Sequence, residues 1–272
     1  MRERRAMAVL VGCSVLALGC GSSGDSSPNT GADGSEADSS VVVCPTSGEV
    51  WEVAKVYIEH NATDEDTGIH GLIGGEPWES VCVTAPDGAQ LWAIAPPDRL
   101  GALGVSDFFW ESNEPPNDEY SIDDLRSDFP EGSYLVAGRG VDGIDRVANA
   151  TFTHAIPTEP VITHPPLVPD IDEADPPVIA PEGLEIRWAS VTETIDGGPA
   201  QITGYQVIVT EEEAEDPNGW ARPVYDVHVD PDAAALPVPD EFLKPDTLYE
   251  VEVLAIEVSG NQTISVGFFL TS

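Results

Sequence analysis

Short runs in which apolar and polar residues alternate recur through the C-terminal third of the chain. The clearest is LYEVEVLAI, residues 248–256, where Tyr249 and Val251 point to one side of an extended chain and Glu250 and Glu252 point to the other. Runs of this length between turn residues predict β-strands that bury one face. The predicted strands cover residues 178–180, 184–188, 202–210, 224–229, 235–238, 248–256 and 264–270. Seven short strands in one small domain are typical of an immunoglobulin-like sandwich.

The N-terminal part of the chain, residues 45–156, carries the same kind of pattern. Extended runs occur in EVWEVAKVYIEHN, in VCVTAPDGAQLWAI and in SYLVAGRGVDGIDRVANATFTHAI. The Pro-Asp-Gly centre of the second run suits a tight turn, because proline presets φ and glycine accepts positive φ. One helix is predicted where Ser121 and Asp124 form the pattern of a capping box before Pro130. The sequence therefore predicts an all-β fold of two β-sandwich domains, the N-terminal one an immunoglobulin-like sandwich with one short helix.

Prolines mark the boundary between the two domains. Eight of them fall within residues 157–181, where they favour stiff, extended backbone and deny a strand its donors. We therefore assign residues 157–177 to a proline-rich linker and residues 178–272 to the C-terminal domain.

The C-terminal domain also carries a family pattern. In LKPDTLY, residues 243–249, apolar, proline, threonine and tyrosine positions alternate as in the tyrosine corner of fibronectin type III domains. The domain resembles that family over residues 178–272, which implies a binding or spacing module and not an enzyme. The residues that carry the resemblance are Leu243, Pro245, Thr247 and Tyr249 of the corner, with Trp188 and Tyr205 as core aromatics.

Residues 1–19 have the pattern of a signal peptide. Arginines at positions 2, 4 and 5 precede an apolar run that is short for a transmembrane helix. Because the run ends in LALGC, the chain resembles a bacterial lipoprotein precursor, which implies cleavage before Cys20 and attachment of lipid there. LVGC, ending at Cys13, is a second match with a shorter apolar run, and an ordinary secreted protein is the alternative. Gly21 in place of an aspartate implies, by the same resemblance, the outer membrane of a Gram-negative bacterium.

A flexible tether is predicted at residues 20–44, where Gly, Ser and Asp dominate and few side chains can enter a core. The whole chain is strongly acidic, with 49 Asp and Glu against 11 Lys and Arg and a net charge of −38 at pH 7. Nucleic acid and anionic lipid are therefore poor partners, because their phosphates would be repelled, and we expect no nucleic acid to bind. The expected contact with the membrane is the N-terminal lipid.

Cysteine usage agrees with export. With Cys13 and Cys20 assigned to the leader and the lipid, Cys44 and Cys82 remain, and an oxidising compartment favours a disulfide between them. Neither has a second cysteine at the short spacing of a structural zinc site.

Candidate metal chemistry is limited to an acidic loop, NATDEDTGIHG. Asp64 and Asp66 offer hard oxygen ligands for calcium, although their spacing does not fit an EF-hand. A plain solvated turn is one alternative, since so acidic a chain produces such clusters by composition alone. A metal site that uses His60 and His70 of this region is the other. No nucleotide-binding, zinc-protease or nucleophile motif occurs, so we expect no cofactor and no catalytic residues.

Aromatic side chains are the remaining candidates for ligand contact. One group lies in DFFWESNEPPNDEY and another aromatic lies in the acidic segment EEEAEDPNGW, where each is either a binding rim or an edge of the core. The residues are Phe108, Phe109, Trp110, Tyr120 and Trp220. The sequence thus predicts a non-enzymatic, lipid-anchored envelope protein that binds a protein or polysaccharide. The alternatives are a structural spacer without a ligand, or an envelope glycan hydrolase with two convergent carboxylates.

Overall fold

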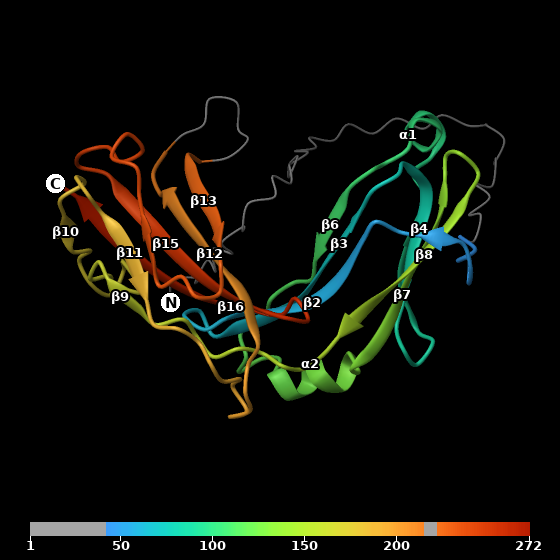
Figure 1. Ribbon diagram of the computed structural model, residues 1–272, viewed down its shortest axis with the longest axis horizontal. Helices are drawn as coiled ribbons and strands as arrows, with labels where there is room; N and C mark the ends of the chain where they lie inside the picture. The colour runs from blue at the N-terminus through green and yellow to red at the C-terminus, as the bar shows by residue number, and fades with distance from the viewer. Residues whose placement is uncertain (1–41, 215–221) are drawn as a thin grey trace, which may run out of the picture.

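The computed structural model describes residues 42–214 and 222–272 (Figure 1). These residues fold into two β-sandwiches that form the arms of a V, with helix α2 near its vertex. The all-β prediction is confirmed.

The elements of the N-terminal arm are β1 (Glu49–Val50), β2 (Val53–Asn61), β3 (Asp66–Gly74), β4 (Trp78–Thr84), β5 (Gln90–Ile94), α1 (Asp98–Leu103), β6 (Phe108–Glu111), α2 (Ile122–Asp128), β7 (Gly132–Gly140) and β8 (Asp145–Phe152). Those of the C-terminal arm are β9 (Ile162–His164), β10 (Val178–Ile179), β11 (Glu185–Trp188), β12 (Ile202–Glu211), β13 (Val224–Val229), β14 (Ala235–Pro237), β15 (Leu248–Glu257) and β16 (Gln262–Thr271).

The N-terminal sandwich packs a sheet of order β1-β8-β7-β4-β5 against strands β2, β3 and β6. Its core is formed by the inward-facing residues of both layers, among them Ile58, Trp78 and Phe152. The predicted helix is present as α2, and its capping box is confirmed: the Ser121 hydroxyl accepts from the Asp124 amide at 3.1 Å. The predicted Cys44–Cys82 disulfide is also confirmed, and it joins the segment before β1 to β4.

The C-terminal sandwich packs β14-β11-β9 against β13-β12-β15-β16. The Tyr249 hydroxyl accepts from the Lys244 amide at 2.9 Å and donates to the Phe242 carbonyl at 3.3 Å, which is the predicted tyrosine corner. Trp188 and Tyr205 are buried with their ring centroids 5.4 Å apart. This arrangement of strands, with the corner and the two aromatics, is the fibronectin type III fold.

One sheet runs through both sandwiches. Strand β16 pairs with β15 on one side and, in parallel, with β2 of the N-terminal sandwich on the other. The result is a continuous sheet of order β13-β12-β15-β16-β2-β3-β6, with β10 added beside β16. Figure 1 shows this shared sheet along the inner side of the V. The prolines had suggested two sandwiches connected only through a linker, and the shared sheet was not foreseen.

The segment between the sandwiches contributes to the second of them. Strand β9 pairs with β11, and Leu167 packs against the C-terminal core, although both lie within residues 157–177. A second helix, α1, was not predicted. Pro97 stands at its N-cap without a capping side chain, and the helix has six residues, so it lacks the usual sequence signals.

Neither helix within residues 42–214 and 222–272 has the length and apolar character that crossing a membrane requires.

Candidate functional site

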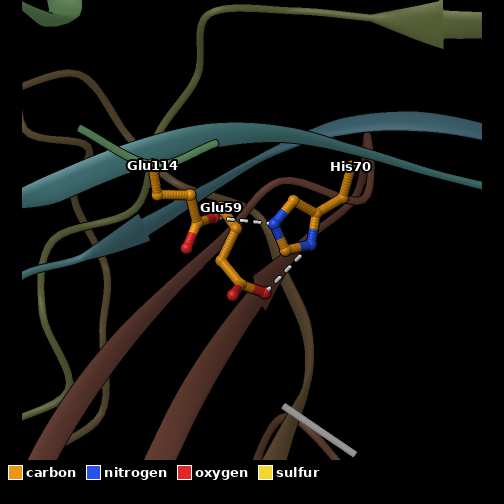
Figure 2. Close-up of side chains that lie close together, drawn as sticks. All are labelled: Glu59, His70 and Glu114. Carbon is orange, nitrogen blue, oxygen red and sulfur yellow. Dashed lines mark hydrogen bonds and ion pairs between the residues drawn. The ribbon is translucent and has the colours of Figure 1, made fainter. Parts of the chain in front are cut away.

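A buried group of ionisable side chains lies where the two sandwiches meet. Glu59 comes from β2, His70 from β3 and Glu114 from the connection between β6 and α2. Figure 2 shows the two ring nitrogens of His70, each joined by a dashed line to one of the two carboxylates. Among the residues that the structure describes, these three form the group of His, Cys, Asp or Glu side chains whose ligand atoms lie within 4.8 Å of one another.

The imidazole of His70 contacts a carboxylate at each nitrogen. Nε2 lies 2.7 Å from Oε1 of Glu114, and Nδ1 lies 3.6 Å from Oε2 of Glu59. His70 and Glu59 are only 2% and 4% exposed, whereas the Glu114 side chain is 27% exposed. The group is therefore buried inside the molecule and open to solvent at Glu114.

A glycine makes room for Glu114. Gly68 faces Glu59 across the β2–β3 pair, so a side chain at position 68 would point to the same side of the sheet. A Cβ atom there would lie 2.6 Å from Cγ of Glu114 and 2.7 Å from its Oε1. Because real Cβ atoms do not approach so closely, Glu114 can cross β3 and reach His70 only over a glycine.

The second sandwich supports the group across the seam, which is the line along which β16 pairs with β2. Gln262 of β16 stands beside Glu59 in the parallel pair and donates its Nε2 hydrogen to the Glu59 carboxylate. The rings of Tyr57 and Phe109 lie 5.5 and 5.6 Å from the His70 ring, so the imidazole has aromatic neighbours on two sides. These contacts fix the orientation of the ring and of one carboxylate.

Burial and charge oppose each other in this group. Burial raises the pKa of Glu59, and the nearby His70 partly offsets the shift. For His70, burial lowers the pKa, but the hydrogen bond to Glu114 and the charge of Glu59 outweigh it and raise the pKa. The arrangement thus favours an imidazolium held between two carboxylates.

This geometry suits holding a proton or a cation better than activating a nucleophile. A histidine that acts as general base needs one free ring nitrogen toward the group that it deprotonates. Both nitrogens of His70 already face carboxylates. The hydroxyl of Ser112 is near Gly68, but it accepts a hydrogen bond from the Ile69 amide and donates one to the Asn113 carbonyl. Its hydrogen bonds are therefore made with the backbone and not with His70.

The predicted calcium ligands do not join this group. Asp64 is exposed, and its carboxylate accepts from Nδ2 of Asn61 at 2.9 Å. Asp66 begins β3, where burial, followed by the charge of Glu114, raises its pKa to about 7. Calcium binding by these two aspartates stays a prediction.

The predicted aromatic rim is spread over different surroundings. Phe108 and Trp110 of β6 pack against the N-terminal core. Phe109 points to the other face of the sheet, where it contacts His70. Tyr120 packs against the same core, and its hydroxyl donates to Asp128 at 2.9 Å. Their role in ligand binding stays a prediction, and Cys20 and Trp220 lie outside the described residues.

Two further carboxylates were expected at the solvent and are buried instead. Glu250 and Glu252 of β15 point away from the C-terminal core, yet each is only 3% exposed. Burial, followed by the charge of Glu250, raises the pKa of Glu252 to about 8. Oε2 of Glu252 accepts no hydrogen bond from the described residues. Strand alternation gave no sign of this burial, because an outward-facing glutamate is normally solvated.

Comparisons with known proteins add little to this description. No protein-family model matches the chain, and a search of curated proteins finds no match. Among solved structures, the FN1–FN3 domains of chicken CNTN1 are 14% identical with a TM-score of 0.32, over 82% of this chain and 65% of that one. A tetra-tandem repeat in the extending region of a large adhesion protein is 12% identical with a TM-score of 0.27, over 81% of this chain and 50% of that one. The chain spans less than two thirds of either structure, so the fold assignment rests on its own strands and tyrosine corner.

Proposed function

We propose that the protein is an exported, lipid-anchored protein of the cell envelope that binds a protein or polysaccharide partner without catalysis. The leader, the LALGC sequence and the Gly/Ser/Asp-rich tether support export and anchoring through Cys20. The outer membrane of a Gram-negative cell is the proposed location, with lipid as the link to the membrane.

The observation that carries the binding function is the sheet shared by the two sandwiches. Parallel pairing of β16 with β2 fixes one sandwich against the other. A partner that contacts both arms then meets a preformed surface and does not have to order a flexible pair of domains, which lowers the cost of binding. Lys55 of β2 and His228 of β13 are both exposed and share the face of the sheet that carries Glu59.

Site-specific photo-crosslinking in cells tests this binding surface. A photoreactive amino acid is placed at Lys55 or at His228, and the controls carry it at Arg187 of β11 or Asn149 of β8, in the opposite sheets. We expect one envelope partner to be crosslinked to the photoreactive residue at Lys55 and at His228, and to neither control position. Equal capture at all four positions, or capture at none, would favour the spacer function instead.

Fatty-acid labelling tests the anchor separately. We expect radiolabelled palmitate in the wild-type chain and in Cys13→Ser, and no label in Cys20→Ser, which should also leave the membrane fraction. Label that persists in Cys20→Ser, or that is lost in Cys13→Ser, would refute the assignment of the lipidated residue.

A further inference from the structure

The group at the seam carries more negative charge than its surroundings neutralise. Among the ion pairs of the described residues, Glu59 and Glu114 pair with His70 and with no lysine or arginine. Asp66 and Glu111 are further carboxyl groups that interact electrostatically with members of this group. Because buried charges are costly unless they are compensated, two carboxylates around one imidazole call for a cation.

We propose that Glu59, His70 and Glu114 form a binding site for a divalent transition-metal cation of the zinc type. The donors are one imidazole nitrogen and two carboxylate oxygens, a set that zinc accepts in proteins. Two carboxylates and a neutral imidazole together carry two negative charges, which a divalent cation cancels. Calcium and magnesium fit less well, since they take oxygen ligands almost exclusively.

The ligand atoms must move closer together on binding. The three ligand atoms lie within 4.8 Å of one another, whereas tetrahedral zinc with bonds of about 2.0–2.2 Å places its ligand atoms about 3.3–3.6 Å apart. Glu114 is the ligand that can move, because it lies in a connection between elements and is partly exposed. Its present hydrogen bond to Nε2 of His70 opens as the cation replaces the shared proton.

The surroundings have the features of a supporting shell. Gln262 donates to Glu59, as outer-shell groups do for metal-bound carboxylates, and Gly68 admits Glu114 over the strand. Tyr57 and Phe109 flank the imidazole and limit its rotation. Since Gln262 belongs to the other sandwich, a cation held by Glu59 also stabilises the seam.

Zinc titration of the full chain tests the site. After treatment with a chelator, the wild-type chain is titrated with zinc by calorimetry and by competition with a chromogenic chelator. We expect one site that His70→Gln or Glu114→Gln weakens at least about tenfold. The matched controls are His228→Gln, an exposed histidine of β13, and Glu119→Gln, an exposed glutamate near Glu114, and both should bind as the wild type does. All variants keep every cysteine, so zinc held by thiols appears equally in each.

Two further measurements distinguish this site from zinc held elsewhere on the acidic surface. Zinc, but not calcium at the same concentration, should raise the unfolding temperature of the wild type and leave that of Glu114→Gln unchanged. X-ray absorption should find one imidazole nitrogen with oxygen ligands around the bound zinc. The metal-free unfolding curve of Glu114→Gln establishes that this variant is folded. No zinc binding by the wild type, binding that both ligand variants retain, or sulfur coordination would each overturn the proposal.

Discussion

At the scale of single residues, Gly68 illustrates how the absence of a side chain builds a site. Glycine in the interior of a strand weakens the strand, and here it lets a carboxylate from a distant connection lie over β3. The gain is the hydrogen bond between Glu114 and His70. The backbone conformation at position 68 does not require glycine, and the glycine there is explained by the Glu114 side chain that crosses the strand.

Substitution Gly68→Ala should displace Glu114, because the new Cβ would lie 2.6 Å from Cγ of that residue. We expect a loss of about 1–3 kcal/mol in the free energy of unfolding and a fall in the pKa of His70, since the hydrogen bond to Glu114 raises that pKa. Urea unfolding and NMR titration of His70 measure the two effects. Gly198→Ala, where the nearest atom is 3.4 Å from the new Cβ, is the control. An unchanged His70 pKa in Gly68→Ala would contradict this role of the glycine.

The buried carboxylate of Glu252 makes stability depend on pH. Its pKa rises from an ordinary value of 4.5 to about 8, so the folded state holds this proton more tightly than the unfolded state does. Its contribution is therefore complete below about pH 4.5 and is lost as the pH rises toward about 8, with a slope of up to about 1.4 kcal/mol per pH unit.

We expect Glu252→Gln to be more stable than the wild type at pH 8 and to lose this advantage toward pH 5. Urea unfolding at pH 5, 6.5 and 8 measures the difference. Glu182→Gln removes an exposed carboxylate and controls for net charge. A difference between Glu252→Gln and the wild type that stays constant across this range would disprove the assignment.

At the scale of elements, alternation predicted most strands because each of them buries one face in its own sandwich. The tyrosine corner and the α2 capping box could also be predicted from the sequence, since their hydrogen-bond partners lie within a few residues. The pairing between β16 and β2 could not be predicted, because no local sequence pattern specifies which distant strand will pair with a given edge. The candidate site shares that limit. His70 lies within the stretch NATDEDTGIHG, but Glu59 and Glu114 reach it only through the β2–β3 and β3–β6 pairs.

The turn that leads into β16 holds the seam through one buried amide. Asn261 is fully buried, and its Oδ1 accepts from the Ile58 amide at 2.8 Å. Its Nδ2 donates to the carbonyls of Thr153 and Ala155 at 2.9 and 3.2 Å. The side chain therefore connects the β15–β16 turn to β2 and to the segment after β8.

Substitution Asn261→Ala leaves these backbone groups buried without their partner. We expect a loss of about 2–4 kcal/mol in the free energy of unfolding, because unsatisfied buried groups retain their desolvation cost. Chemical denaturation measures the loss, and Asn149→Ala on the exposed side of β8 is the control. Equal effects of the two substitutions would show that Asn261 does not hold the seam.

At the scale of the whole molecule, the shared sheet makes the two sandwiches one mechanical unit. The usual expectation for tandem domains is relative motion unless the interface is large or continuous. Here a side-chain hydrogen bond between α2 and the C-terminal sandwich adds to the pairing of β16 with β2, since Arg126 donates to the Asp196 carboxylate at 2.6 Å. The V in Figure 1 is therefore a fixed geometry that holds the two arms at one angle.

Hydrogen exchange followed by mass spectrometry tests this coupling. We expect the protected amides of β3 and β12, one strand from each arm, to open with the same free energy in the wild type, because neither sandwich unfolds alone. In Asn261→Ala the two opening free energies should separate. Distinct values already in the wild type would mean that the sandwiches unfold independently.

Strand β16 also sets an order of events in synthesis. Glu59 and its neighbour Gln262 are 203 positions apart, so β2 is made long before the strand that covers its edge. Until then a nascent chain presents an unpaired edge, which is a template for association with other chains. Pairing of the β2 edge therefore waits for the second sandwich, and a product interrupted before β16 would keep that edge open to other chains.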